Sequence, residues 1–173
     1  MPAVQATNCT FGLENMEQTD EDTMPGLYLD TNNPAPCGGE LTEWSLCYYR
    51  VLARRQYQVE LQVWRESATN NEYTLVGSSA QTVTTRFLDD VFVCRRYSLL
   101  QSDSIPVQQG DIVGVYLEGR TRGNSALGVV ATSNVQGSVL HHTQQLSSTL
   151  QLSELSRVDG VKMHISANIG MIR

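Results

Sequence analysis

The four cysteines are the residues of this 173-residue chain whose types and spacing most directly suggest chemistry. Cys9, Cys37, Cys47 and Cys94 are separated by 28, 10 and 47 positions. A structural zinc site needs close pairs such as Cys-x2-Cys, which these spacings do not provide. A nucleophilic cysteine needs a histidine base and an orienting partner. The three histidines stand in no recognisable catalytic context, namely His141, His142 and His164.

Two disulfides are therefore the favoured use of the cysteines, and four cysteines allow three pairings. We favour Cys47 with Cys94, because both lie in segments expected to be core strands. Cys9 with Cys37 would then pin the amino-terminal segment. An even number of cysteines agrees with an oxidising, extracellular compartment. Asn8-Cys9-Thr10 also agrees with it, because this is an acceptor sequence for N-linked glycosylation at Asn8.

The first residues give a conflicting indication about the compartment. Met1-Pro2-Ala3-Val4-Gln5 lacks the charged start and apolar run of a secretory signal. Taken alone, that favours a cytosolic protein, but a mature or excised domain would begin in the same way. The cysteines and the glycosylation acceptor favour the second interpretation, and we expect an extracellular, secreted protein.

Asp111 is the candidate metal ligand, in the segment Gln109-Gly110-Asp111. A calcium ion needs several oxygen ligands that converge in space, and the acidic clusters at 20–22 and 89–90 contain further carboxylates. The simpler interpretation is a tight turn, in which glycine accepts a positive φ and Asp111 hydrogen-bonds nearby backbone amides. We expect the turn, with Ca²⁺ as the alternative and no other cofactor.

Aromatic and polar side chains suggest a recognition site, because glycan-binding sites combine aromatic rings with groups that bond hydroxyls. Trp64 and Tyr116 are the aromatic candidates. Arg120, Arg122 and Asn124 lie in a polar loop that is expected to be exposed. For Trp64 a place in the core is the preferred interpretation, since strand alternation can turn the ring inward, and for the loop an ordinary surface hairpin is preferred.

An enzymatic alternative rests on two carboxylates, Glu60 and Glu118, which both lie on or next to expected strands. Glycoside hydrolases use a pair of such groups. Nothing in the sequence spacing selects this pair, so we expect a protein without enzymatic activity.

The charge distribution argues against a nucleic-acid partner. The chain has 12 basic and 18 acidic residues and a formal net charge of -6, and its basic residues are scattered singly or in pairs. No run of 18 apolar residues is present, so no membrane span is expected.

Alternating apolar and polar residues indicate strands with one solvent-facing side. The alternation is clearest at 57–64 and along 161–171. Further strands are expected at 41–49, 72–76, 81–87, 91–99, 112–117, 126–132 and 148–152. Turn signals such as Gly77-Ser78-Ser79 separate most of them. Only residues 146–155 suggest a helix.

One all-β domain follows from this pattern. We expect a single antiparallel β-sandwich of about eight or nine strands, jelly-roll-like, over residues 37–173. Residues 1–36 are acidic and rich in turn signals, which predicts an irregular, disulfide-pinned segment packed on the domain. Within it, 26–29 is expected to form an edge strand.

Several short motifs occur in a fixed order between residues 37 and 173. They are Cys37-Gly38-Gly39, Trp44, Cys47-Tyr48-Tyr49, Val63-Trp64-Arg65, Tyr73-Thr74-Leu75-Val76-Gly77, Phe92-Val93-Cys94, the segment 105–115 and a closing apolar strand. As an ordered set they resemble an extracellular β-sandwich module of secreted, receptor-like and adhesion-like proteins of marine invertebrates, notably sponges. The resemblance implies an extracellular, disulfide-containing, non-enzymatic recognition or scaffold module. A looser similarity to the tumour-necrosis-factor and C1q jelly rolls implies a trimer.

These observations together predict a secreted, non-enzymatic recognition or adhesion module. Its ligand is either a glycan, which would make it lectin-like, or a protein, at the cell surface or in the matrix. One alternative is a structural protein of the extracellular matrix or of a filament, which self-associates through exposed edge strands. A trimeric ligand of the tumour-necrosis-factor or C1q type is another. Both alternatives predict a homo-oligomer.

Overall fold

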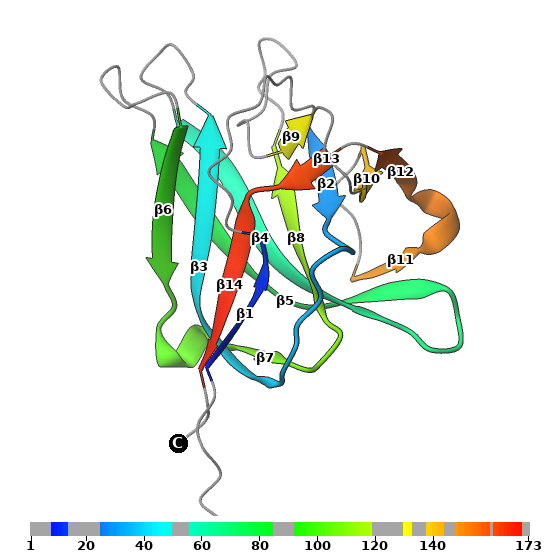
Figure 1. Ribbon diagram of the computed structural model, residues 1–173, viewed down its shortest axis with the longest axis horizontal. Coiled ribbons are helices and arrows are strands. Elements are labelled where there is room, and N and C mark those ends of the chain that lie inside the picture. The colour runs from blue at the N-terminus through cyan, green and yellow to red at the C-terminus, as the bar shows by residue number, and fades with distance from the viewer. Residues whose placement is uncertain are drawn as a thin grey trace, which may run out of the picture.

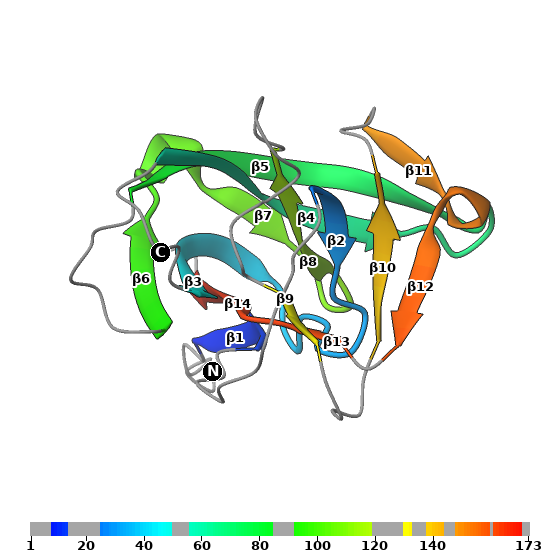
Figure 2. The same cartoon turned by 90° about the horizontal axis from the view of Figure 1, so that it is seen from above.

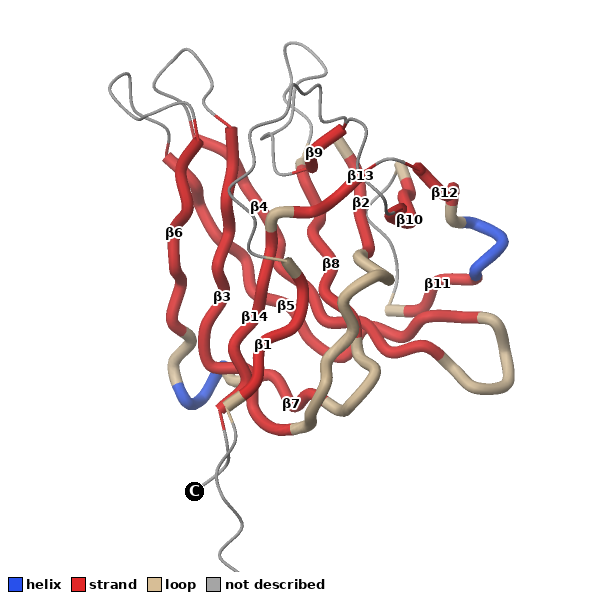
Figure 3. The backbone as a smooth tube through the Cα atoms, viewed as in Figure 1, coloured by secondary structure: helices blue, strands red, loops and turns tan. Residues whose placement is uncertain are grey.

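The computed structural model of the protein describes residues 8–13, 25–49, 56–84, 92–118, 130–132, 138–143, 148–159 and 161–170. Strands dominate these residues, which confirms the all-β class (Figures 1 and 3). Within the described ranges the helical segments are two short 3-10 turns, η1 (Gln101–Asp103) and η2 (Leu152–Glu154). The described part of the chain contains no helix long and apolar enough to cross a membrane.

The smaller of the two main sheets has five antiparallel strands. Its order is β1 (Cys9–Gly12), β14 (Ile165–Gly170), β3 (Gly39–Tyr49) and β6 (Phe92–Ser98), and β7 (Ile105–Val107) also pairs with β3. Cys47 lies directly opposite Cys94 in the register of β3 and β6, and the two form a disulfide. The pairing that the sequence favours is therefore present, and it joins β3 to β6, which is an edge strand of this sheet and not a central one.

The larger sheet has seven antiparallel strands and curls into a half-barrel (Figure 2). Its order is β11 (Thr149–Gln151), β5 (Glu72–Thr84), β4 (Gln56–Glu66), β8 (Ile112–Leu117), β2 (Gly26–Leu29), β10 (Ser138–His142) and β12 (Ser156–Asp159). A two-stranded sheet of β13 (Val161–Met163) and β9 (Val130–Thr132) completes the described strands. The described residues thus form fourteen strands, more than the eight or nine expected.

Strand alternation divides the buried side chains into two clusters. Along β4, every second residue from Tyr57 to Val63 is buried and belongs to the cluster that joins the two main sheets. The fully buried Trp44 belongs to the same cluster. The opposite face of the seven-stranded sheet carries a second cluster of six buried residues, Leu27, Leu29, Trp64, Tyr73, Ile112 and Leu150. Because the sheet buries side chains on both faces, simple apolar and polar alternation describes only part of it.

β5 runs without interruption through Gly77, although the sequence predicts two strands separated by a turn. β4 pairs with β5 along its whole length, and a register shift beside Val63 accommodates one extra residue. A β-carbon added at Gly77 would lie 2.8 Å from Cγ2 of Ile105 on β7. The glycine therefore provides room for packing between the sheets, and its interpretation as a turn signal was wrong.

The carboxyl-terminal alternation also forms two strands and not one. β13 ends at Met163 and β14 begins at Ile165 in a different sheet. His164 lies between them with only 1% of its surface exposed, and its carbonyl accepts a hydrogen bond of 2.9 Å from the backbone N–H of Cys47. The alternation along 161–171 places His164 on the face opposite the apolar residues, which is expected to face solvent. That prediction was wrong, because the chain changes sheets at this residue.

The amino-terminal segment contributes two strands, β1, which the sequence does not predict, and β2, which confirms the strand expected at 26–29. β1 pairs with β14, and β2 lies between β8 and β10 with all four of its residues buried. β2 is therefore an interior strand and not an edge strand. Cys9 forms a disulfide with Cys37, as favoured from the sequence, and this bond ties β1 to the segment that leads into β3.

Candidate functional site

Tyr116, Glu60 and Glu118 line one hollow on the face of the seven-stranded sheet that points away from the five-stranded sheet. Glu60 on β4 is directly opposite Tyr116 on β8, and Glu118 follows the last residue of β8. Their neighbours Leu61 and Val115 belong to the core between the sheets, so alternation turns Glu60 and Tyr116 to the other side. Gln58, Val59 and Ala80 complete the lining of the hollow, whose volume is about 130 Å³.

Burial and charge set the chemical character of this hollow. Tyr116 is half-buried and packs against the second apolar cluster. Burial raises the pKa of Tyr116, and the negative charges of Glu118 and Glu60 raise it further. The phenol is protonated at neutral pH, as an ordinary tyrosine is, and can donate a hydrogen bond, while the carboxylates accept hydrogen bonds. The hollow offers an aromatic ring together with a donor and acceptors, the combination that a hydroxyl-rich ligand requires.

Trp64 lies in the core, which is the preferred interpretation of the sequence, and its burial contradicts the alternative of a ligand platform. Its exposed fraction is 1%, and its Nε1 donates a hydrogen bond of 2.8 Å to Oε1 of Gln62. A β-carbon added at Gly114 would lie 2.9 Å from Cδ1 of Trp64, so this indole rests against the backbone of β8. Gly114 is paired with Gln62 in the register of β4 and β8. Arg120, Arg122 and Asn124 lie outside the described residues.

Asp111 is a structural residue of the turn that precedes β8. It is 1% exposed, and its two carboxylate oxygens accept hydrogen bonds of 2.8 Å from Nε and Nη2 of Arg65. The backbone N–H of Gln108 donates to the same carboxylate at 2.8 Å, and Gly110 has φ +94°, so the expected turn is confirmed. The hydrogen bond to Asp111 raises the pKa of Arg65 against the opposing effect of burial.

Metal-ligating groups do not converge in the described part of the chain. No three or more histidine, cysteine, aspartate or glutamate side chains are placed there to hold one ion. His141 and His142 face opposite sides of β10, as expected for adjacent strand residues. The ring of His141 lies 4.5 Å from that of Tyr28, centroid to centroid, whereas His142 is opposite Leu27.

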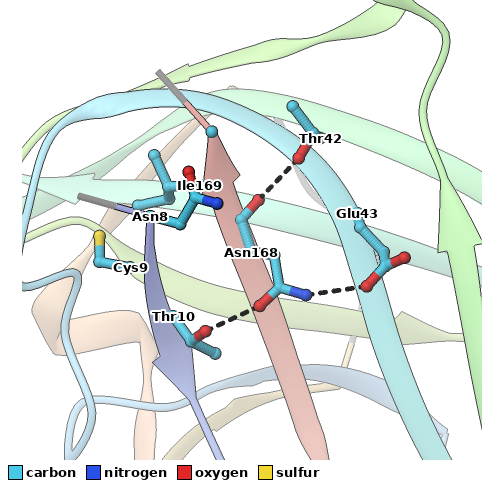
Figure 4. Close-up of a pocket in the computed structure, with 8 residues that line it drawn as sticks. Asn8, Cys9, Thr10, Thr42, Glu43, Asn168 and Ile169 are labelled. Carbon is cyan, nitrogen blue, oxygen red and sulfur yellow. Dashed lines mark hydrogen bonds between the residues drawn. The ribbon is translucent and has the colours of Figure 1, made fainter. Parts of the chain in front are cut away.

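A second, larger hollow of about 350 Å³ lies on the five-stranded sheet beside Asn8 (Figure 4). A hydrogen-bonded row crosses three strands at its floor: Thr10 Oγ1 donates to Asn168 Oδ1 at 2.7 Å, and Asn168 Nδ2 donates to Glu43 Oε1 at 2.8 Å. The register shift between Asn168 and Ile169 leaves Thr42 as an extra residue of β3 at the rim.

Sequence reasoning missed this row because its members lie far apart in the chain. Thr10 and Asn168 are 158 positions apart, and no local motif connects them. Gln58 was missed for a similar reason, since it and Glu118 line the same hollow only because β4 pairs with β8. The structure does bring Tyr116 together with Glu60 and Glu118. The sequence suggests Tyr116 for ligand recognition and the two carboxylates for glycoside hydrolysis.

Comparison with known proteins identifies no relative on which a functional assignment can rest. The chain matches no protein-family model, no curated protein and no solved structure. The two disulfides are consistent with an oxidising, extracellular environment.

Proposed function

We propose that this protein is an extracellular recognition module, a jelly-roll-like β-sandwich that binds a glycan through the hollow at Tyr116. The observation that carries the proposal is the convergence of Tyr116 with Glu60 and Glu118 on adjacent strands. The ring offers an apolar face to a sugar, and the carboxylates accept hydrogen bonds from its hydroxyls. The resemblance to receptor-like and adhesion-like modules of sponges agrees with this class of function.

The size of the hollow limits how much of a ligand it can enclose. Pockets that enclose a small-molecule ligand have volumes of about 300–1,000 Å³, whereas this hollow measures about 130 Å³. It would therefore receive one part of a larger ligand and leave the rest on the surface. Glu60 and Tyr116 lie on strands, and Glu118 directly follows one. The strands preorganise these three side chains for binding.

A glycan array followed by titration calorimetry tests the proposal. The array identifies a ligand, and calorimetry compares the wild type with Tyr116→Ala, Tyr116→Phe and Glu118→Gln. We expect Tyr116→Ala to weaken binding at least tenfold, which corresponds to about 1.4 kcal/mol, because it removes the stacking surface. Tyr116→Phe keeps the ring and should lose less.

Glu66→Gln is the matched control. Glu66 is an exposed carboxylate at the end of β4, the strand that carries Glu60, and it lies outside the hollow. It should bind like the wild type. Retained binding by Tyr116→Ala would refute the site, and steady turnover of an array ligand that is lost in Glu118→Gln would replace recognition with glycoside hydrolysis.

Self-association is the second candidate function, and the free edge of β5 favours it. β11 pairs only with residues 72–74 of β5, and no other described strand pairs with β5 on that side. The stretch from 76 to 84 carries no charged residue. Two other edge strands carry charges, Arg157 and Asp159 on β12 and Arg96 on β6. β1 is also an uncharged edge strand, but it has only four residues. Because charged side chains and short length both protect edges from pairing, the long uncharged stretch of β5 is the edge best suited to pairing with another chain.

Light scattering at several protein concentrations tests this second function. If two copies pair through β5, the mass doubles with rising concentration, and the variant Ser78→Lys/Thr84→Lys stays monomeric. Ser153→Lys serves as the control, because Ser153 is exposed in η2 and lies away from the edge. A monomer at all concentrations would exclude self-association through β5, and a stable trimer insensitive to Ser78→Lys/Thr84→Lys would favour the tumour-necrosis-factor or C1q type.

A further inference from the structure

The acceptor sequence at Asn8 coincides with the larger of the two hollows. Asn8 is exposed and directly precedes β1, which is an edge strand of the five-stranded sheet. It also lines the hollow of about 350 Å³ (Figure 4). Thr10, the third residue of the acceptor sequence, lies on the outer face of β1 and donates to Asn168. The motif and the hollow are independent observations, one from sequence and one from packing.

The walls of this hollow suit a polar sugar with an acetamido group. Thr42 and Glu43 contribute a hydroxyl and a carboxylate, and Ile169 contributes apolar surface. Gly170 keeps the hollow open, since a β-carbon there would lie 3.1 Å from Cγ2 of Thr42. The volume falls within the range of about 300–1,000 Å³ that small-molecule sites occupy, so the hollow has room for a sugar ring.

We propose that Asn8 carries an N-linked glycan and that its first N-acetylglucosamine lies in the hollow formed by Thr42, Glu43 and Gly170. The bond forms between the Asn8 amide nitrogen and the anomeric carbon of a lipid-diphosphate-linked oligosaccharide. The anomeric carbon–oxygen bond breaks, the lipid diphosphate leaves, and the amide nitrogen loses one proton. The inference rests on the proposed extracellular location and not on the hollow at Tyr116.

Two consequences follow from the place of this glycan. It covers the start of β1 and so shields that edge of the five-stranded sheet from pairing with another chain. In Figure 1, β1 begins and β14 ends at one end of the molecule, and β8 ends at the opposite end. The hollow beside Asn8 is lined by residues at the start of β1 and the end of β14, whereas the hollow at Tyr116 is lined by residues at the end of β8. Modification of Asn8 therefore leaves the proposed ligand site open.

Expression of the protein with a heterologous signal sequence in insect or mammalian cells tests whether Asn8 is glycosylated. Peptide mapping after peptide-N-glycosidase treatment should show Asn8 converted to aspartate. Asn8→Gln and Thr10→Val should lack the glycan, and Thr10→Ser, which keeps the acceptor sequence, should retain it. A secreted, folded wild type with unmodified Asn8 would overturn the inference. If that protein still bound its ligand through Tyr116, the proposed function would stand without it.

The rate of glycan release tests the position of the first sugar. The native protein should release the glycan about tenfold more slowly than the denatured protein, which corresponds to about 1.4 kcal/mol of protection. Glu43→Gln and Gly170→Ala should accelerate release from the native state, and the control Ser98→Ala, an exposed residue of β6 outside the hollow, should not. Equal release rates for native and denatured wild type would show that the hollow does not hold the sugar.

Discussion

At the scale of single residues, the ion pair of Arg65 and Asp111 fixes the turn before β8. The side chain of Arg65 is 37% exposed and that of Asp111 is 1% exposed. Because water cannot reach the carboxylate, Asp111 depends on its protein partners for hydrogen bonds more than the guanidinium of Arg65 does. Arg65→Met leaves a buried carboxylate with one hydrogen bond from Gln108. We expect a loss of about 3 kcal/mol in the free energy of unfolding, measured by urea denaturation.

The double variant Arg65→Met/Asp111→Asn is the control for this prediction. It removes both charges and keeps a side chain that accepts the hydrogen bond from Gln108, so it should recover part of the loss. If Arg65→Met lies within 0.5 kcal/mol of the wild type, the range typical of a neutral surface change, the ion pair does not support the turn.

His141 gives the fold a pH dependence. Burial lowers its pKa, the charge of His142 lowers it further, and the hydrogen bond with the Pro25 carbonyl opposes this. The unfolded chain, with a histidine pKa of about 6.5, then binds more protons than the folded protein at mildly acidic pH. The stability that His141 contributes as a neutral ring is present above pH 6.5 and is lost as the pH falls through the folded pKa.

Urea denaturation at several pH values checks this expectation. The free energy of unfolding of the wild type should decrease between pH 7 and pH 5. His141→Phe keeps a ring against Tyr28 that cannot be protonated, so its decrease should be smaller. Identical pH profiles for the two proteins would contradict a role for His141.

At the scale of elements, the packing of β5 against β7 depends on Gly77. A β-carbon at this position would approach Cγ2 of Ile105 to 2.8 Å, so Gly77→Val should cost about 1–3 kcal/mol of stability through overpacking. Ile105→Ala in the same chain should relieve part of that cost. Ser78→Ala, on the exposed face of the same strand, is the control and should be nearly neutral. If Gly77→Val has the same melting temperature as the wild type, the two sheets accommodate the added side chain without a cost in stability, which would contradict the prediction.

The sequence could predict those elements in which local pattern and tertiary pairing agree. The alternation at 57–64 gives β4, and Gln109-Gly110-Asp111 gives the turn before β8. It could not predict β1, β10 or β12, which are four or five residues long and owe their pairing to distant strands. Nor could it predict the break at His164, because the change of sheet is a property of the partners and not of the alternating residues.

The candidate site was predictable to a similar extent. Tyr116 stood out as an aromatic residue at the end of an apolar strand, and Glu60 and Glu118 as carboxylates on or next to strands. Their proximity depends on the register of β4 with β8, which no local signal determines. The core position preferred for Trp64 was right, but the sequence could not show that the ring belongs to a second buried cluster on the other face of the sheet.

At the scale of the whole molecule, two disulfides join segments far apart in the sequence. Cys47–Cys94 spans 47 residues and Cys9–Cys37 spans 28. Chain entropy predicts that the longer link contributes about 4 kcal/mol and the shorter about 3.6 kcal/mol. Cys47→Ser/Cys94→Ser should therefore destabilise the fold at least as much as Cys9→Ser/Cys37→Ser, in urea denaturation without reductant. A wild-type denaturation midpoint for both double variants would contradict a structural role for the disulfides.

The most direct test of the proposed recognition function is amide chemical-shift mapping of the labelled protein during titration with the best glycan from the array. The proposed site predicts that the largest shifts cluster on β4 and β8 around Glu60, Tyr116 and Glu118, and that they disappear in Tyr116→Ala. Shifts concentrated elsewhere, or unchanged in Tyr116→Ala, would contradict it.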